Sequence, residues 1–346
     1  MSYKRFDAED IVISAESVTA PVWTGDIVTL DGFFTSSTQI GGVSGDYYYN
    51  IYQTGSDLAN ARTQFAIGYA DEKGSGSLLF NDAIPGKSPS SVLYGQYRNL
   101  VLGDEEADFT FGTQTSEYFY VISVDRARYR EKLLPGSLDI TLCYSSSYTA
   151  NVPALRLTDN SKLVTTTTFS DSGRVYELIS GSTGVLSAGA KNSDGFTNGS
   201  GSYGKFLPDI GVILINGRAL DGNIEDGGLK FSTNRSNNPA EAANTRRFYD
   251  LFTHEPKFRL QSEETISSNF IFVRARNAEF NYSTNPSLIT GSGELRHNVM
   301  INSPQSFITT VGLYNDNNDL LAVAKLSRPL LKDFTKEALV RIKLDY

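Results

Sequence analysis

The clearest structural signal in the chain is the stretch FITTVGLYNDNNDLLAVAKLS, from Phe307 to Ser327. Two apolar runs lie on either side of a polar turn, Asp316 to Asp319. Asn and Asp tolerate the positive φ that tight hairpin turns require. The stretch therefore predicts a β-hairpin near the C-terminal end of the chain.

Alternation of apolar and polar residues with a period of two, the pattern of a half-buried strand, recurs elsewhere. The last ten residues, EALVRIKLDY, alternate strictly and are expected to lie in a sheet, with Val340, Ile342 and Leu344 on one face. Further strands are expected at 47–52, 63–70, 116–124, 137–144, 174–181 and 209–217. A hairpin that turns at Asp159 and Asn160 is expected over 155–169, and a strand pair or one bent strand over 264–280.

Three short helices are expected between these strands. The first has Ser88 as its N-cap, Pro89 at its first position and Gly103 just past its end, with an apolar stripe of Val92, Tyr97, Leu100 and Val101. The second is capped by Asp125 and covers 126–134. The third covers 238–252, with an Asn cap and a proline at its start.

The composition agrees with a mainly β fold. Charged residues make up only 20% of the chain, whereas Tyr, Phe and Gly are abundant, as in proteins with many strands and turns. We therefore expect a mainly β (α+β) protein with antiparallel, β-sandwich-like sheets. The length of 346 residues predicts about two domains.

The expected domains are an extended N-terminal arm at 1–35, an α+β domain at 36–150 and a β-rich domain at 151–346. The stretch 187–203 consists almost wholly of turn-forming residues and is expected to be a long exposed loop. Because both chain ends are expected in strands, the two domains could share strands from opposite ends.

Net charge and rare residue types exclude several functions. A net charge of −8 and a pI of about 5.0 argue against direct binding of nucleic acid, which needs Lys and Arg to neutralise phosphates. His254, His297 and Cys143 are too few and too scattered for a zinc site, and a single thiol excludes an intrachain disulfide. No apolar run approaches the length of a membrane span, so we expect a soluble protein without membrane contact.

The short motifs that resemble functional signatures lack the required context. The stretch GSGSYG, 199–204, lies in a polar loop rather than between a strand and a helix, and GKS, 86–88, is followed by a proline. The acidic stretches DEEAD, 104–108, and NDNND, 315–319, lack calcium-loop spacing. We therefore assign no catalytic, cofactor-binding or metal-binding residue, and expect a protein that is not an enzyme and has no cofactor.

Several stretches resemble virion proteins of contractile-tailed bacteriophages, particularly the marine and cyanobacterial members of the T-even-like group. They are FFTSSTQ (Phe33–Gln39), YGQYRNLVLGDE (Tyr94–Glu105), RARYREKLLPGSL (Arg126–Leu138), FVRARNAEFNYSTNPS (Phe272–Ser287) and the terminal residues 309–346. The ending resembles the closing β-unit of baseplate wedge and tail-fibre attachment proteins. The resemblance implies a structural subunit of a virion that is assembled in the host cytoplasm.

The expected role is a tail baseplate wedge subunit that docks other virion proteins, in the baseplate, tail or neck, and forms a homo-oligomer. The arm, the loop at 187–203 and the terminal strands are the expected contacts. An alternative is that the chain is a neck protein or a capsid-decorating protein of the same particle. A polysaccharide-binding protein of the tailspike type is a further alternative, because aromatic-rich β surfaces bind sugars.

Overall fold

The computed structural model describes residues 4–23, 28–29, 34–35, 48–55, 58–77, 80, 83–84, 88–143, 154–186, 202–236, 243–252 and 257–345. The chain is 44% strand and 15% helical, which confirms the expected mainly β, antiparallel fold. The loop expected at 187–203 lies outside the described residues except at its end, where Ser202 and Tyr203 are buried.

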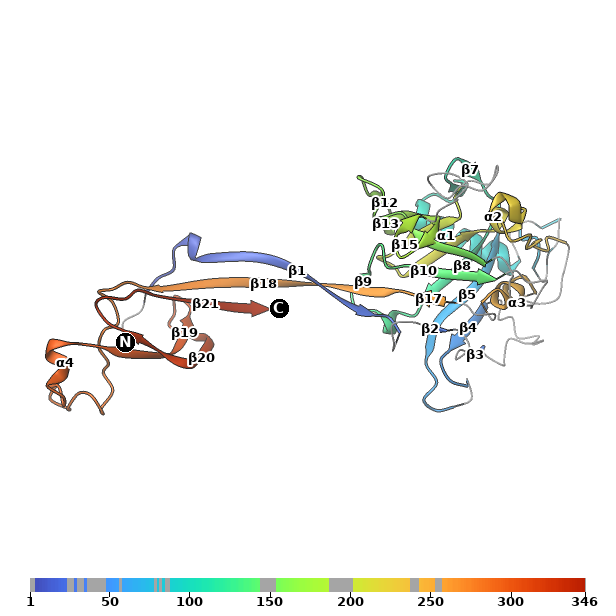
Figure 1. Ribbon diagram of the computed structural model, residues 1–346. Coiled ribbons are helices and arrows are strands. Elements are labelled where there is room, and N and C mark those ends of the chain that lie inside the picture. The colour runs from blue at the N-terminus through green and yellow to red at the C-terminus, as the bar shows by residue number, and fades with distance from the viewer. Residues whose placement is uncertain are drawn as a thin grey trace. The chain divides into compact units, whose positions relative to one another are not determined.

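The chain divides into two compact units. The larger unit is Val18–Glu264, and the smaller unit combines the residues up to Ser17 with those from Thr265 onward. The boundary therefore falls inside two strands, β1 (Ile11–Pro21) and β18 (Gln261–Ala275) (Figure 1). Neither boundary that the sequence predicted, 35/36 or 150/151, is a boundary between these units.

The 150/151 boundary would cut through one sheet. Strand β10 (Asp139–Cys143) pairs antiparallel with β11 (Ala154–Asp159), with Ile140 opposite Leu157. Both residues are fully buried in the same core. Strand pairing between β10 and β11 therefore crosses the expected boundary inside the larger unit, while the first and last segments of the chain form the other unit.

One large sheet, which curls into a half-barrel, organises the larger unit. Its strand order is β2 (Val28–Thr29), β17 (Lys257–Arg259), β10, β11, β13 (Gly173–Ser182), β15 (Gly204–Leu207), β16 (Val212–Asn216), β8 (Tyr118–Val124), β5 (Thr63–Asp71), β4 (Tyr48–Tyr52) and β3 (Phe34–Thr35). Strands β12 (Thr168–Ser170) and β14 (Val185–Leu186) pair with β13, and β6 (Thr110–Phe111) pairs with β7 (Gln114–Thr115).

Both faces of this sheet are buried at β8. Tyr120 and Ile122 point into one core, and Phe119 and Val121 into the other. Helix α1 (Pro89–Leu102) contributes to the second core, whereas α3 (Ala243–Asp250) contributes Phe248 to the first. Burial on both faces explains why the sequence of β8 is an almost continuous apolar run rather than an alternating one.

Helix α1 has the predicted bounds, because its end signals are local. Ser88 is its N-cap, and Gly103 ends it in the left-handed conformation, with a φ of +65°. The predicted apolar stripe was partly wrong. Tyr97 and Val101 are buried, but Val92 and Leu100 are exposed, and Tyr94 is buried instead. The helix is rotated so that Tyr94 packs against Phe109 and Phe119.

Of the two other predicted helices, the one at 126–134 was wrong and the one at 238–252 is described in part. Asp125 does cap a helix, but it is the single 3₁₀ turn η4 (Arg126–Arg128), and the chain then enters strand β9 (Lys132–Leu133), which pairs with β18. Helix α3 begins at Ala243, and the predicted start at 238 lies outside the described residues. The sequence did not predict η1 (Ala8–Asp10), α2 (Gly217–Asp221), η5 (Ile224–Asp226) or α4 (Val299–Asn302).

The predicted hairpin over 155–169 was also wrong. Strand β11 pairs with β13 rather than with the segment directly after it, and β12 forms the hairpin with β13. The reason lies at Asp159, which is fully buried and accepts hydrogen bonds from the backbone N–H groups of Gly136 and Ser161. These bonds hold the turn residue against another segment instead of leaving it at a hairpin tip.

The smaller unit consists of a three-stranded arrangement, β1–β18–β21, and a hairpin. Strand β21 (Ala338–Asp345) pairs with β18, and β19 (Ser306–Tyr314) pairs with β20 (Leu320–Lys332) (Figure 1). Ile271, Leu313 and Ile342 form its buried core. The structure thus confirms the C-terminal hairpin and terminal strand that the sequence predicted.

Candidate functional site

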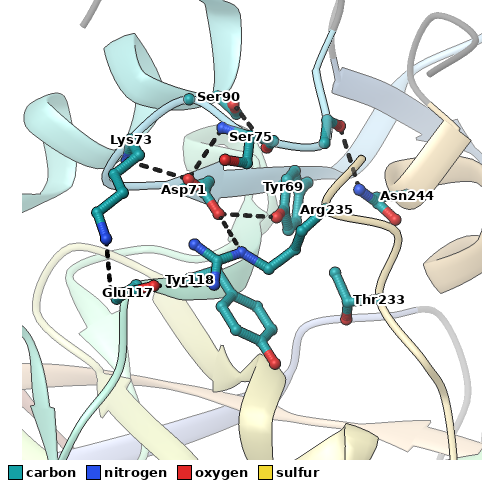
Figure 2. A network of polar contacts seen from close by, with 12 residues as sticks. Tyr69, Asp71, Lys73, Ser75, Ser90, Glu117, Tyr118, Thr233, Arg235 and Asn244 are labelled. Atoms are coloured by element: carbon teal, nitrogen blue, oxygen red, sulfur yellow. Dashed lines mark hydrogen bonds and ion pairs between the residues drawn. The ribbon is translucent and has the colours of Figure 1, made fainter. Parts of the chain in front are cut away.

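A buried carboxylate, Asp71 at the end of β5, organises a polar network in the larger unit (Figure 2). One oxygen accepts hydrogen bonds from the backbone N–H groups of Lys73 and Ser75, each at 3.0 Å. The other accepts from the hydroxyl of Tyr69 at 3.1 Å and from Nε of Arg235 at 2.8 Å. Four hydrogen bonds fill the acceptor capacity of an ionised carboxylate.

Arg235 joins this carboxylate to a second one. Its Nη1 donates to Glu117 at 2.8 Å, and its guanidinium lies 4.7 Å from the ring centroid of Tyr118. Burial alone would lower the pKa of Arg235, but Asp71 and then Glu117 outweigh it and raise that pKa. Hydrogen bonds from Lys73 and from Arg235 lower the pKa of Glu117 below its ordinary value. Arg235 and Glu117 are therefore held in their charged forms.

The network extends to the segment that carries Arg235. Asp221, at the end of α2, accepts hydrogen bonds from the hydroxyl of Tyr118 at 2.7 Å and from the backbone N–H of Thr233 at 2.7 Å. Asn244 of α3 exchanges two hydrogen bonds with the backbone of Asn234. The segment around 233–236 is thus fixed to β5, β8, α2 and α3 at once.

The chemistry of the network fits a structural clamp. Burial, and after it the nearby Asp71, raises the pKa of Tyr69, while burial and then Asp221 raise the pKa of Tyr118. Both phenols therefore stay neutral hydrogen-bond donors. We call Asp71, Arg235 and Glu117 the clamp. Each of these three charged groups is paired with another of the three, so their interactions hold segments of the fold together.

Sequence reasoning did not identify this clamp. Asp71 and Arg235 are separated by 164 positions, and each lies in a stretch without a recognisable motif. The only local signal was the turn-rich stretch directly after β5, whose backbone N–H groups bind Asp71.

The residues that the sequence singled out lie apart from the clamp. Cys143 ends β10 in the larger unit, His297 is exposed in the smaller unit, and His254 lies outside the described residues. Among the described residues, no group of three or more His, Cys, Asp or Glu side chains could hold a metal ion. In the same part of the chain, no helix has the length and apolarity of a membrane span.

The stretches that resemble functional motifs have structural roles where the structure describes them. The hydroxyl of Ser88 donates to the carbonyl of Gly74. Gly204 begins β15, where a Cβ would lie 2.0 Å from the carbonyl oxygen of Leu214, so glycine permits close strand contact there. Asn315 closes the hairpin turn by accepting hydrogen bonds from the backbone of Asn317 and Asp319.

The smaller unit exposes apolar side chains on regular strands. We define the outer hairpin face as Tyr314, Leu320, Leu321 and Val323 of the β19–β20 hairpin, all of which are exposed. We define the β1 edge as residues 11–16 of β1, where Ile11, Val12 and Ile13 are exposed and Ile13 is 73% exposed. Exposed apolar groups in such an array mark interaction surfaces in soluble proteins.

Comparisons of the chain with family models, with curated proteins and with solved structures find no match. Two features of the molecule bear on its function: the clamp, whose charged groups pair with one another, and the exposed apolar strands of the smaller unit.

Proposed function

We propose that the chain is a structural subunit of a contractile-tailed bacteriophage particle, in the baseplate wedge, and that it acts by docking neighbouring subunits rather than by catalysis. The observation that carries the proposal is the outer hairpin face. Leu321 and Val323 are 68% and 56% exposed on strand β20, where an ordinary solvent face would be polar.

The balance of buried and exposed apolar groups in the smaller unit supports docking. Among the described residues of this unit, the buried cluster consists of Ile271, Leu313 and Ile342, whereas Leu320, Leu321 and several others remain in water. Burying a side chain such as Leu or Val contributes about 1.5–3 kcal/mol. A neighbour that covers this face would therefore add to the stability of a unit whose own core is small.

The resemblance of several stretches to phage virion proteins supports the kind of particle, and the exposed strands support the mode of action. The charged groups of the clamp bind one another, which favours a scaffold role for the larger unit. In this proposal the larger unit is a rigid body, and the smaller unit supplies contacts.

The test is incorporation of variants into particles. Leu321→Ser combined with Val323→Thr should keep the fold, because both side chains are exposed, and should lower incorporation by about tenfold or more, since roughly 1.4 kcal/mol corresponds to tenfold in affinity. Val92→Ser is the matched control, because Val92 is 61% exposed on α1 and lies outside the smaller unit. Incorporation is measured by quantitative immunoblotting of purified particles.

Normal incorporation of the double variant would contradict docking through this face. Immunogold labelling of particles then tests where in the particle the protein is located. Label at the baseplate supports the wedge, and label at the neck or head refutes it. Clearing of host capsule by the purified protein would refute the non-catalytic proposal in favour of a tailspike-type activity.

A further inference from the structure

The β1 edge lacks the protection that edge strands usually carry. Strand β1 pairs with β18 on one side, and in the described part of the chain no strand pairs with its other side. It is eleven residues long and begins with Ile11, Val12 and Ile13, and its only charged residue is Glu16. A long, apolar, unpaired edge is a template for the addition of another strand.

The other strands at the edges of the smaller unit are protected. Strand β21 carries Arg341 and Lys343, and β20 carries Lys325 and Pro329 next to an irregularity in its pairing with β19. Strand β19, the other edge of the hairpin sheet, has no charged residue and no proline, but its pairing with β20 is irregular at two places along its length. Charged side chains, proline and bulges are the devices that prevent edge-to-edge association. The presence of at least one such device on each of β19, β20 and β21, and their absence along Ile11–Ile13, single out the β1 edge.

The contacts of Glu16 show which way the side chains of β1 point. Its carboxylate binds Nζ of Lys343 at 2.8 Å, and Lys343 points away from the core of the smaller unit. Because successive side chains of a strand alternate, Ile11 and Ile13 point to the opposite face, which is that of Ile342. The core face of the sheet therefore continues onto β1, where Ile13 remains uncovered.

Charge indicates what kind of strand fits. Asp7, Glu9 and Asp10 directly precede β1, and the ion pairs found among the described residues include none of them. A second copy paired antiparallel about Ile13 would place its Glu16 opposite Asp10, and like charges in opposition are destabilising. A strand with Lys or Arg beside this acidic segment would be attracted to it.

We propose that the β1 edge accepts an extended strand from a different protein of the particle, with alternating apolar residues that cover Ile11 and Ile13 and with Lys or Arg residues that face Asp7, Glu9 and Asp10. Main-chain hydrogen bonds supply the affinity of such strand addition, and the alternate side chains supply specificity. This inference rests on the proposed docking function and names the partner chemistry for one of its surfaces.

The first experiment uses the full-length chain and a fluorescein-labelled synthetic peptide, Lys-Lys-Thr-Val-Thr-Val-Thr-Val-Thr. Fluorescence anisotropy should show saturable binding that weakens as salt is added. A peptide with two Glu in place of the two Lys should bind about tenfold more weakly, or worse. Equal binding of the two peptides would overturn the charge assignment, and absence of binding by the Lys peptide would overturn the proposal.

Variants of β1 test whether the peptide binds at the β1 edge. Ile13→Lys adds an edge charge and should abolish peptide binding, while Leu339→Lys, at an exposed position of β21, should leave it unchanged. Backbone N–H groups of adjacent strand residues point to opposite edges. Of Ile13→Pro and Ser14→Pro, one should therefore lower the melting temperature by removing a bond to β18, and the other should block the peptide while the melting temperature is kept.

Failure of this inference is distinguishable from failure of the proposed function. If Ile13→Lys binds the peptide and enters particles normally while the outer hairpin variant does not, the β1 inference falls and the docking function stands. If the chain never enters particles but the Lys peptide binds and Ile13→Lys abolishes the binding, the edge assignment stands and the proposed function falls.

Discussion

Two buried charged side chains show how this chain accommodates polar groups in its interior. Asp71 accepts hydrogen bonds from two backbone N–H groups, a hydroxyl and a guanidinium. Lys332, fully buried in the smaller unit, donates all three of its N–H bonds, to Asn281 at 2.7 Å and to the carbonyls of Asn277 and Asp333 at 3.0 Å each. Buried polar atoms that are paired in this way cost little, whereas loss of one partner leaves the others unsatisfied.

At Asp71 this asymmetry gives a prediction. Asp71→Ala should lower the free energy of unfolding of the larger unit by about 3 kcal/mol or more, because Arg235 and Tyr69 lose their buried acceptor. Glu105→Ala, at an exposed carboxylate of the same unit, should change it by less than about 0.5 kcal/mol. Denaturant titration measures the unfolding free energies of both variants. The signal is the fluorescence of Trp23, the single tryptophan, which packs against Phe65 and Phe258. Equal effects would show that the clamp adds no stability.

Among the elements, those with local end signals were predictable and those set by distant contacts were not. The bounds of α1 follow from Pro89 and Gly103, and the β19–β20 hairpin follows from its polar turn. The buried face of α1 depends on the aromatic side chains of β8, and the course of the chain after β11 depends on Gly136. The clamp could not be predicted, because its ion pairs join positions far apart in the sequence.

Helix α1 offers a pair of glycines with opposite expected effects. Gly103→Ala should destabilise by about 1 kcal/mol or more, because a Cβ at a φ of +65° is strained and would lie 2.0 Å from the carboxylate of Asp171. Gly95→Ala, in mid-helix with no atom within 4 Å of the new Cβ, should stabilise by about 0.5–1 kcal/mol. Denaturant midpoints measure both, and shifts of the same sign would contradict the assigned helix end.

On the scale of the whole molecule, charge is unevenly divided between the units. The smaller unit holds 11 Lys and Arg and 11 Asp and Glu, so the whole net charge of −8 belongs to Val18–Glu264. Like-charge repulsion among many larger units would keep them apart before assembly, whereas the neutral unit carries the exposed apolar strands.

The pH limits of stability follow from groups in the larger unit. Because the pKa of Glu117 is lowered in the folded chain, this residue adds stability at pH values above 4.5, its ordinary pKa. That stability is lost as the pH falls through the pKa of Glu117 in the folded chain. Burial raises the pKa of Tyr94 and of Tyr203 to about 12, so their contribution is full below pH 10 and is lost as the pH rises toward 12. Circular dichroism and tyrosinate absorbance across the pH range should show ionisation of these tyrosines together with unfolding. Complete tyrosine ionisation near pH 10 in a chain that keeps its circular dichroism would contradict this expectation.

Strands β1 and β18 each extend from one unit into the other, and this has a consequence for biosynthesis. Residues 1–17 leave the ribosome before the larger unit, but the strands with which they form the smaller unit, from Thr265 onward, are translated after it. At about 5–20 residues per second, the nascent Ile11-Val12-Ile13 segment waits on the order of tens of seconds for its native neighbour. A chaperone that holds this segment, or the early arrival of a strand from another protein, would therefore act on the nascent chain before the smaller unit can form.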